Sequence, residues 1–155
     1  MTPRAAAILL ALASALHAAD PTPAPSPSPT PDPARAAAAA LRARALELAG
    51  AFSNDGFKTR DGSWSGRLEP GEPRRVAVHL FAGNQYWFAA AVPETARAPR
   101  LTLHDPAGNP VPATTHEGPG LAAVGVTAGT TGRYVLQIEA GGPNPADFNL
   151  VYLFK

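Results

Sequence analysis

The stretch LTLHDPAG, residues 101–108, decides the fold, because it joins a strand of alternating apolar residues to a tight turn. Leucines recur at positions 101 and 103, and Asp-Pro followed by Gly is turn chemistry. Three comparable units precede or follow it, LEPGE at 68–72, GNQYWF at 83–88 and TGRYVL at 131–136. Successive units of this kind predict an antiparallel β-sandwich.

Outward from this stretch, the apolar period is two from Trp64 to the end of the chain. With the intervening Gly, Asn and Pro turns, the pattern predicts an all-β sandwich or jelly roll of about eight strands over residues 64–155. The expected strands are 64–68, 74–82, 85–92, 100–104, 111–115, 122–127, 133–139 and 148–154. The aromatic residues expected to point inward are Tyr86, Phe88, Tyr134, Phe148, Tyr152 and Phe154.

One amphipathic α-helix is expected ahead of the sandwich, over residues 34–52. Asp32 is a suitable N-cap, Pro33 a suitable first helical residue, and the alanines that follow have high helix propensity. A single apolar stripe recurs at spacings of four, three and four residues, formed by Leu41, Ala45, Leu48 and Phe52. Such a stripe docks on its own domain or, as the alternative, on a membrane surface or a partner.

The first 33 residues predict export. Residues 1–19 have a positive start at Arg4, a short apolar run and small residues at Ala18 and Ala19, which is the pattern of a signal peptide. A retained N-terminal anchor is the alternative. Residues 20–33 have proline at almost every second position and predict an extended linker of polyproline II type, either a functional stalk or a leader left after cleavage.

Composition narrows the class of protein. The chain has no cysteine, which excludes a disulfide framework and a lipid anchor on cysteine, and favours the bacterial periplasm or exterior. Lys plus Arg number 13 and Asp plus Glu number 12. Because removal of residues 1–19 removes only Arg4, the remaining chain is formally neutral. No net positive charge is available to bind nucleic acid.

The four units at 68–72, 83–88, 101–108 and 131–136 resemble, in that order, the bacterial pre-peptidase C-terminal domain and related collagen-binding-like β-sandwich domains. The resemblance extends from Leu68 to about Phe154. It implies a small non-catalytic domain of an exported protein. Some such domains bind calcium through an Asp-x-Asp before the Leu-x-Leu strand, but residues 97–100 here read Arg-Ala-Pro-Arg, so we expect no calcium site.

The residues that carry chemistry elsewhere are scattered in this chain. His79, His104 and His116 show no local spacing for a metal pair, and no Gly-x-Ser-x-Gly motif is present. The carboxylate of Asp105 is expected to accept backbone N–H groups across its own turn, with calcium binding there as the alternative. We therefore predict no catalytic residue, no metal ligand and no cofactor, with hydrolase activity as the less favoured alternative.

Two aromatic residues have the outward parity of their strands, namely Phe81 and Trp87, and His79 shares that parity. On adjoining strands they would form an exposed platform for a polysaccharide or protein ligand. The favoured interpretation is that the helix covers this face, with its stripe against Phe81, Trp87, Ala89 and Ala91. An exposed Trp87 would favour a binding module, and a covered Trp87 an interaction protein.

The sequence therefore predicts a non-catalytic, exported binding or accessory module, periplasmic or secreted, with no membrane span after signal cleavage. The expected partner is a polysaccharide or a protein of that compartment. The alternative is a structural or interaction protein of the periplasm without a small ligand. Trp87, Phe81 and His79 are the candidate ligand-binding residues.

Overall fold

The computed structural model describes residues 32–155. One α-helix and a short 3-10 helix are followed by an antiparallel array of nine strands, which confirms the predicted all-β sandwich preceded by a helix. The elements are α1 (Pro33–Gly50), η1 (Ser53–Asp55), β1 (Lys58–Thr59), β2 (Trp64–Leu68), β3 (Arg74–Leu80), β4 (Gln85–Ala91), β5 (Arg100–His104), β6 (Thr114–Gly118), β7 (Leu121–Thr127), β8 (Gly132–Glu139) and β9 (Ala146–Phe154). The predicted signal peptide at 1–19 and residues 20–31 of the predicted linker lie outside the described residues.

The helix begins where the sequence predicts. The side chain of Asp32 accepts a hydrogen bond of 3.0 Å from the backbone N–H of Ala34, and Pro33 occupies the first turn. The helix ends at Gly50, two residues earlier than predicted, and the Ser53 hydroxyl then donates to the Gly50 carbonyl. Within residues 32–155, no helix has both the length and the apolar character needed to cross a bilayer.

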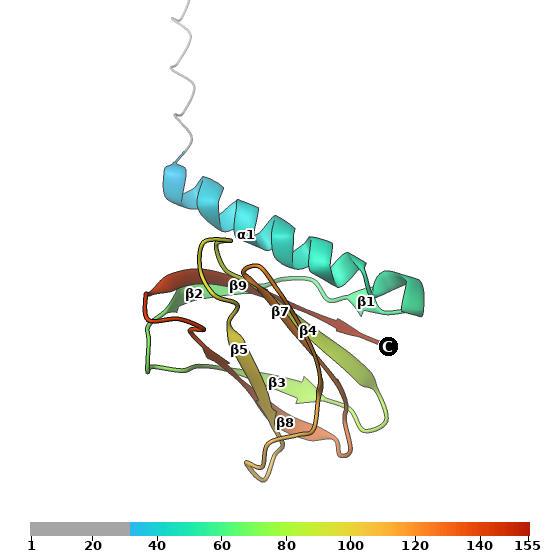
Figure 1. The fold of residues 1–155 in the computed structure, drawn as a ribbon. Coiled ribbons are helices and arrows are strands. Elements are labelled where there is room, and N and C mark those ends of the chain that lie inside the picture. The colour runs from blue at the N-terminus through green and yellow to red at the C-terminus, as the bar shows by residue number, and fades with distance from the viewer. Residues whose placement is uncertain (1–31) are drawn as a thin grey trace, which may run out of the picture. The chain divides into compact units, whose positions relative to one another are not determined.

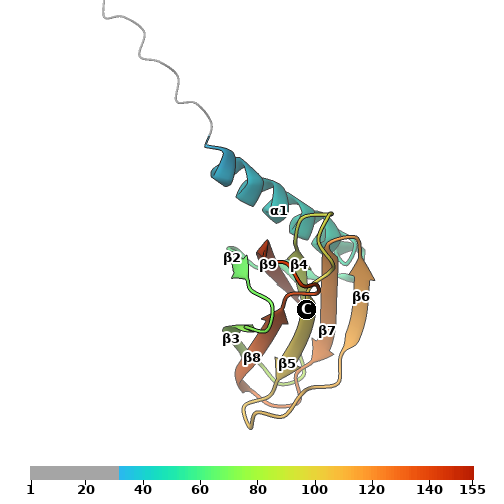
Figure 2. The same ribbon diagram turned by 60° about the vertical axis from the view of Figure 1, so that its left-hand side comes forward.

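The strands form two sheets. The large sheet has the order β1-β9-β4-β7-β6, with β2 also paired to β9, and the small sheet has the order β3-β8-β5. Figures 1 and 2 show the small sheet facing the large one, with α1 on the far side of the large sheet. The domain therefore has three layers, which are helix, large sheet and small sheet.

The core lies between the two sheets and consists of the residues predicted to point inward. Phe88, Leu136, Ile138 and Leu150 are fully buried there, and Tyr134 nearly so. The strand β1 was not predicted, because a two-residue strand is too short for an alternating pattern to show.

A second apolar cluster lies between α1 and the outer surface of the large sheet. Ala45 and Ala49 of the helix are fully buried against Ala89 and Ala91 of β4 and Val151 of β9. Alanine on both surfaces lets helix and sheet approach closely. We call the outer surface formed by Ala89, Ala91, Ala123, Val151 and Leu153 the helix-covered face.

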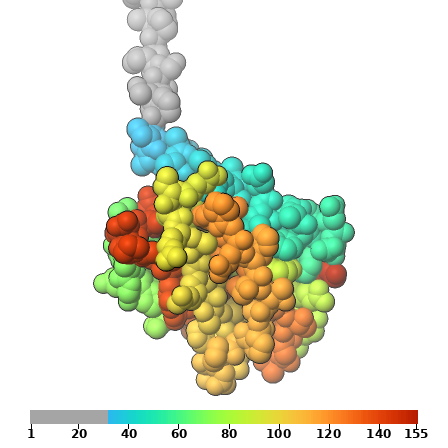
Figure 3. Space-filling model, viewed as in Figure 1, coloured from blue at the N-terminus to red at the C-terminus, as the bar shows by residue number. Residues whose placement is uncertain are grey.

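Arg44 fixes the helix to the loops at one end of the sandwich. Its guanidinium donates to the carbonyls of Val92 at 2.6 Å and Pro119 at 2.7 Å, and lies 3.3 Å from the carboxylate of Glu94. Figure 3 shows the helix in continuous contact with this loop region. The helix is thus held by polar contacts at its side as well as by the apolar stripe.

The predicted partners of the helix are partly wrong. Ala89, Ala91 and Trp87 do lie under it, but Phe81 does not, because β3 and β4 belong to different sheets. The sequence predicted Phe81 and Trp87 on adjoining strands with a shared outer face. In the structure the connection through Gly83-Asn84 carries the chain from the small sheet to the large one, and Phe81 lies in it, 54% exposed.

Candidate functional site

At one open edge of the sandwich, aromatic and polar side chains line two small hollows. Strand β9 pairs with β1 at Thr59 and with β2 from Trp64, and the segment 60–63 between them leaves the ladder. Two hydrogen bonds still join this segment to β9: the Arg60 N–H donates to the Tyr152 carbonyl at 2.9 Å, and the Asn149 amide donates to the Ser63 hydroxyl at 3.3 Å. The gap between this segment and β3 opens to solvent.

Two adjoining hollows of about 360 and 180 Å³ occupy this gap, and Arg60, His79 and Tyr152 line both. We call them together the aromatic cleft. Its walls also include aromatic side chains from four separate segments, Trp64, Phe81, Tyr86 and Phe154. Apolar rings with a few polar groups are typical of ligand sites.

Stacked rings make the floor of the aromatic cleft rigid. The ring centroid of Tyr152 lies 5.6 Å from that of Trp64 and 5.5 Å from that of Phe88, and both pairs are stacked. The Arg60 guanidinium lies 5.7 Å from the Tyr152 centroid, within cation–π range. Burial raises the pKa of the Tyr152 hydroxyl above 10.0, and Arg60 partly offsets this shift. The phenol is therefore neutral at physiological pH and suited to hydrogen bonding rather than to proton abstraction.

Phe81 lies at the rim of the aromatic cleft, where its ring is exposed and its backbone is hydrogen-bonded to Tyr86. Phe81 contacts His79 edge to face, with ring centroids 5.2 Å apart. The backbone N–H of Phe81 donates to the Tyr86 hydroxyl at 2.9 Å, and the Asn84 amide reaches the same oxygen at 3.4 Å. Because Tyr86 is buried in the core, its hydrogen bond holds the backbone of Phe81 in position.

Trp87, the third predicted ligand residue, lies on the other side of the large sheet. Its ring stacks on Phe52 at 4.1 Å, and a Cβ placed on Gly125 would come within 2.5 Å of it. The tryptophan ring thus occupies the space that the missing side chain of Gly125 leaves. Trp87 also lines an open hollow of about 730 Å³ beside β6. His79 and Phe81 come together as predicted, but Trp87 does not join them.

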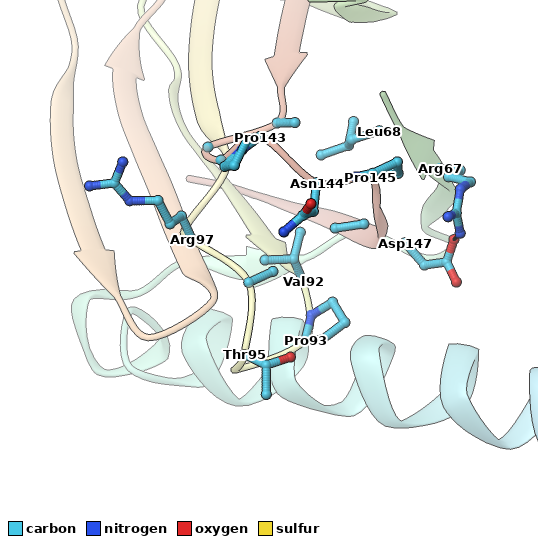
Figure 4. Close-up of a pocket in the computed structure, with 15 residues that line it drawn as sticks. Arg67, Leu68, Val92, Pro93, Thr95, Arg97, Pro143, Asn144, Pro145 and Asp147 are labelled. Atoms are coloured by element: carbon cyan, nitrogen blue, oxygen red, sulfur yellow. Dashed lines mark hydrogen bonds and ion pairs between the residues drawn. The ribbon is translucent and has the colours of Figure 1, made fainter. Parts of the chain in front are cut away.

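A separate hollow of about 380 Å³ lies at one end of the sandwich, between the loops that follow β4 and β8 (Figure 4). Its walls are mainly proline and small apolar residues, with Asn144 inside. At its rim, Arg67 and Asp147 face each other at 3.3 Å, while Arg97 points away from the hollow. A Cβ on Gly141 would come within 1.8 Å of the Ala98 carbonyl oxygen, so glycine is required for these loops to meet. We interpret this hollow as a product of loop packing.

The carboxylate of Asp105 stabilises the turn in which it lies. Its Oδ1 accepts from the N–H of Asn109 at 2.8 Å and of Ala107 at 2.9 Å, as the sequence predicts. The Asn109 N–H is the main cause that lowers the pKa of this carboxyl below 3.8. In residues 32–155, no three His, Asp or Glu side chains gather in a way that would hold a metal ion.

Arg60, Trp64 and Tyr152 of the aromatic cleft were not predicted as site residues. Tyr152 has the inward parity of its strand and is mostly buried, so it was assigned to the core. Arg60 lies in a connection whose path depends on how β1 and β2 share β9. The sequence signal that could have found them is the dense set of polar and aromatic residues over 60–64 before a regular strand.

The described residues define a helix-covered antiparallel β-sandwich with an aromatic cleft at one open edge. No family model and no curated protein matches this chain. The resemblance to the pre-peptidase C-terminal domain therefore remains a prediction from the sequence.

Proposed function

We propose that this chain is an exported, non-catalytic binding module, similar in role to pre-peptidase C-terminal domains, and that its aromatic cleft holds a polysaccharide. The observation that carries the proposal is the exposed ring of Phe81 beside His79, next to the Arg60–Tyr152 pair. A rigid ring gives contact area at a small entropic cost, and adjacent polar groups orient hydroxyl-bearing ligands.

The alternative is a structural or interaction protein of the periplasm. Trp87 favours this alternative, because Phe52 of the segment that follows the helix covers one side of its ring, in line with the interpretation favoured from the sequence. The two proposals differ in which surface meets a partner. A polysaccharide in the aromatic cleft depends on Phe81 and Arg60, whereas a protein interaction elsewhere does not.

The test is binding to a panel of soluble polysaccharides by affinity electrophoresis, with variants in matched pairs. Phe81→Ala and Arg60→Ala remove groups of the cleft. His116→Ala and Arg42→Ala remove an exposed ring on β6 and an exposed guanidinium on α1, and serve as controls. We expect the cleft variants to lose at least tenfold in affinity and the controls to bind as the original chain does. Failure of every polysaccharide to bind, or equal binding by Phe81→Ala, would favour the interaction protein.

A further inference from the structure

The outer surface of the small sheet carries a concentration of positive charge. Strict alternation of burial along β3, β8 and β5 shows which residues point away from the core. The basic residues among them are Arg75, His79, Arg100, His104 and Arg133, which we call the basic face. Arginine stays charged across the physiological pH range.

The two acidic side chains near the basic face, Glu139 and Asp105, already have hydrogen-bond partners. Glu139 is the one acidic residue among the outward positions of these three strands, and it accepts a 2.6 Å hydrogen bond from Gln137 and lies 3.8 Å from Arg100. The Asp105 carboxylate accepts backbone N–H groups of its own turn. Three arginines thus lie near two carboxylates, those of Glu139 and Asp105, in a chain with near-equal numbers of acidic and basic residues.

The strand register spreads these charges along one direction. Arg133 lies opposite His79, and Arg75 lies opposite Gln137, four residues further along the ladder. Arg100 lies opposite Glu139, two residues beyond. At 3.4 Å per residue the basic face is roughly 20 Å long. Arg75, His104 and Arg133 line a hollow of about 620 Å³ on it, and Asp105 lies at the same hollow.

The basic face and the aromatic cleft meet at His79. This side chain projects from the basic face opposite Arg133 and also lines both hollows of the cleft. One extended ligand can therefore contact the ring of Phe81 and continue across Arg133 toward Arg75.

We infer that the ligand of this module is an anionic polysaccharide carrying carboxylate groups, with its charges on the basic face; this inference rests on the proposed function. Guanidinium groups bind carboxylates in bidentate pairs, and charges that recur along a polymer match arginines that recur along a sheet. No arginine cluster of this kind lies on the helix-covered face of the described chain, which is formed by Ala89, Ala91, Ala123, Val151 and Leu153.

The experiment compares polygalacturonate with the same polymer after reduction of its carboxyl groups, which keeps the sugar chain and removes the charge. Binding is measured by titration calorimetry with the full chain, the double variant Arg75→Gln/Arg133→Gln, and the control double variant Arg35→Gln/Arg42→Gln on the exposed side of α1. Thermal unfolding of each variant verifies that it is folded.

We expect polygalacturonate to bind at least tenfold more tightly than the reduced polymer, and this difference to disappear in Arg75→Gln/Arg133→Gln but not in the control. Affinity for the charged polymer is expected to fall about tenfold between 50 and 500 mM NaCl, because salt screens exposed charges.

Equal binding of the charged and reduced polymers, with loss of both in Phe81→Ala, would overturn the inference and leave the proposed function standing. Binding of neither polymer, or binding unaffected by Phe81→Ala, would contradict the proposed function itself. Duplex DNA binding as tightly as polygalacturonate, with the same dependence on Arg75 and Arg133, would overturn the assignment to a polysaccharide.

Discussion

The outer surfaces of the two sheets differ: that of the large sheet is apolar and covered by α1, and that of the small sheet is basic and exposed. On the large sheet, Ala89, Ala91 and Val151 are completely buried beneath α1. On the small sheet, the equivalent positions carry Arg75, His79 and Arg133, all of them exposed. The first surface contributes to stability, and the second is free to meet a ligand.

The strand sequences already contain this difference. In β9 every residue from Phe148 to Leu153 is buried, and apart from Asn149 these residues are apolar or aromatic on both sides of the strand. In β3 and β8, buried and more exposed residues alternate strictly. Continuous apolar strands thus mark a sheet covered on both faces, and alternating strands mark a sheet with one face in water.

The largest expected difference between the two faces is the change in the free energy of unfolding when the same charged residue is placed on each. Val151→Asp puts a carboxylate without a partner under α1, where Val151 has no exposure, and we expect a loss of more than about 4 kcal/mol in the free energy of unfolding. Val135→Asp, on the outer side of the central strand β8, is expected to cost about 1 kcal/mol, because aspartate fits a strand less well than valine. Chemical denaturation of both variants measures the difference, and similar losses would show that the two faces are not distinct.

A smaller loss of stability is expected when the contact between Phe52, which follows the helix, and Trp87 is removed. Phe52→Ala removes the ring that stacks on Trp87 and is expected to cost roughly 2 to 3 kcal/mol, since Phe52 is half-buried. The indole of Trp87 then becomes accessible to acrylamide, while that of Trp64 does not change. Phe81→Ala is the matched control, because Phe81 is 54% exposed, and its expected cost is less than about 1 kcal/mol. Unchanged quenching in Phe52→Ala would mean that the helix does not shield Trp87.

The smallest effect concerns the turn beside the basic face. The pKa of Asp105 lies below 3.8 in the folded chain, mainly because of the Asn109 N–H, so the ionised carboxylate stabilises the folded state. This stabilisation is complete above pH 3.8 and is lost as the pH falls through the lower, folded-state pKa. Asp105→Asn should therefore melt slightly below the original chain from pH 7 to 5, with the gap closing in more acidic solution. A gap that persists unchanged at pH 2 would contradict this role.

Local patterns predicted most of the fold. The alternation of β3, β5 and β8 gave their inward residues, and the capping by Asp32 gave the start of α1. It was harder to predict to which sheet each strand belongs, because a turn such as Gly83-Asn84 can close a hairpin or carry the chain across to the other sheet. This one ambiguity placed Phe81 wrongly beside Trp87.

The aromatic cleft could be predicted only in part for the same reason. His79 and Phe81 are close in sequence, so their parity sufficed. Arg60 and Tyr152 are ninety-two positions apart, and they meet because β1 and β2 both pair with β9 and leave segment 60–63 outside the ladder. No short-range pattern encodes that arrangement.

We propose that the ligand meets the basic face and the aromatic cleft rather than the helix-covered face. The most direct measurement is a titration of the ¹⁵N-labelled chain with oligogalacturonate, followed by amide chemical shifts. We predict shifts that centre on His79, Phe81 and Arg133 and extend along β3 and β8, with α1 and β7 unchanged. Shifts concentrated on α1, on β7 beside Trp87, or around Asn144 would contradict the account.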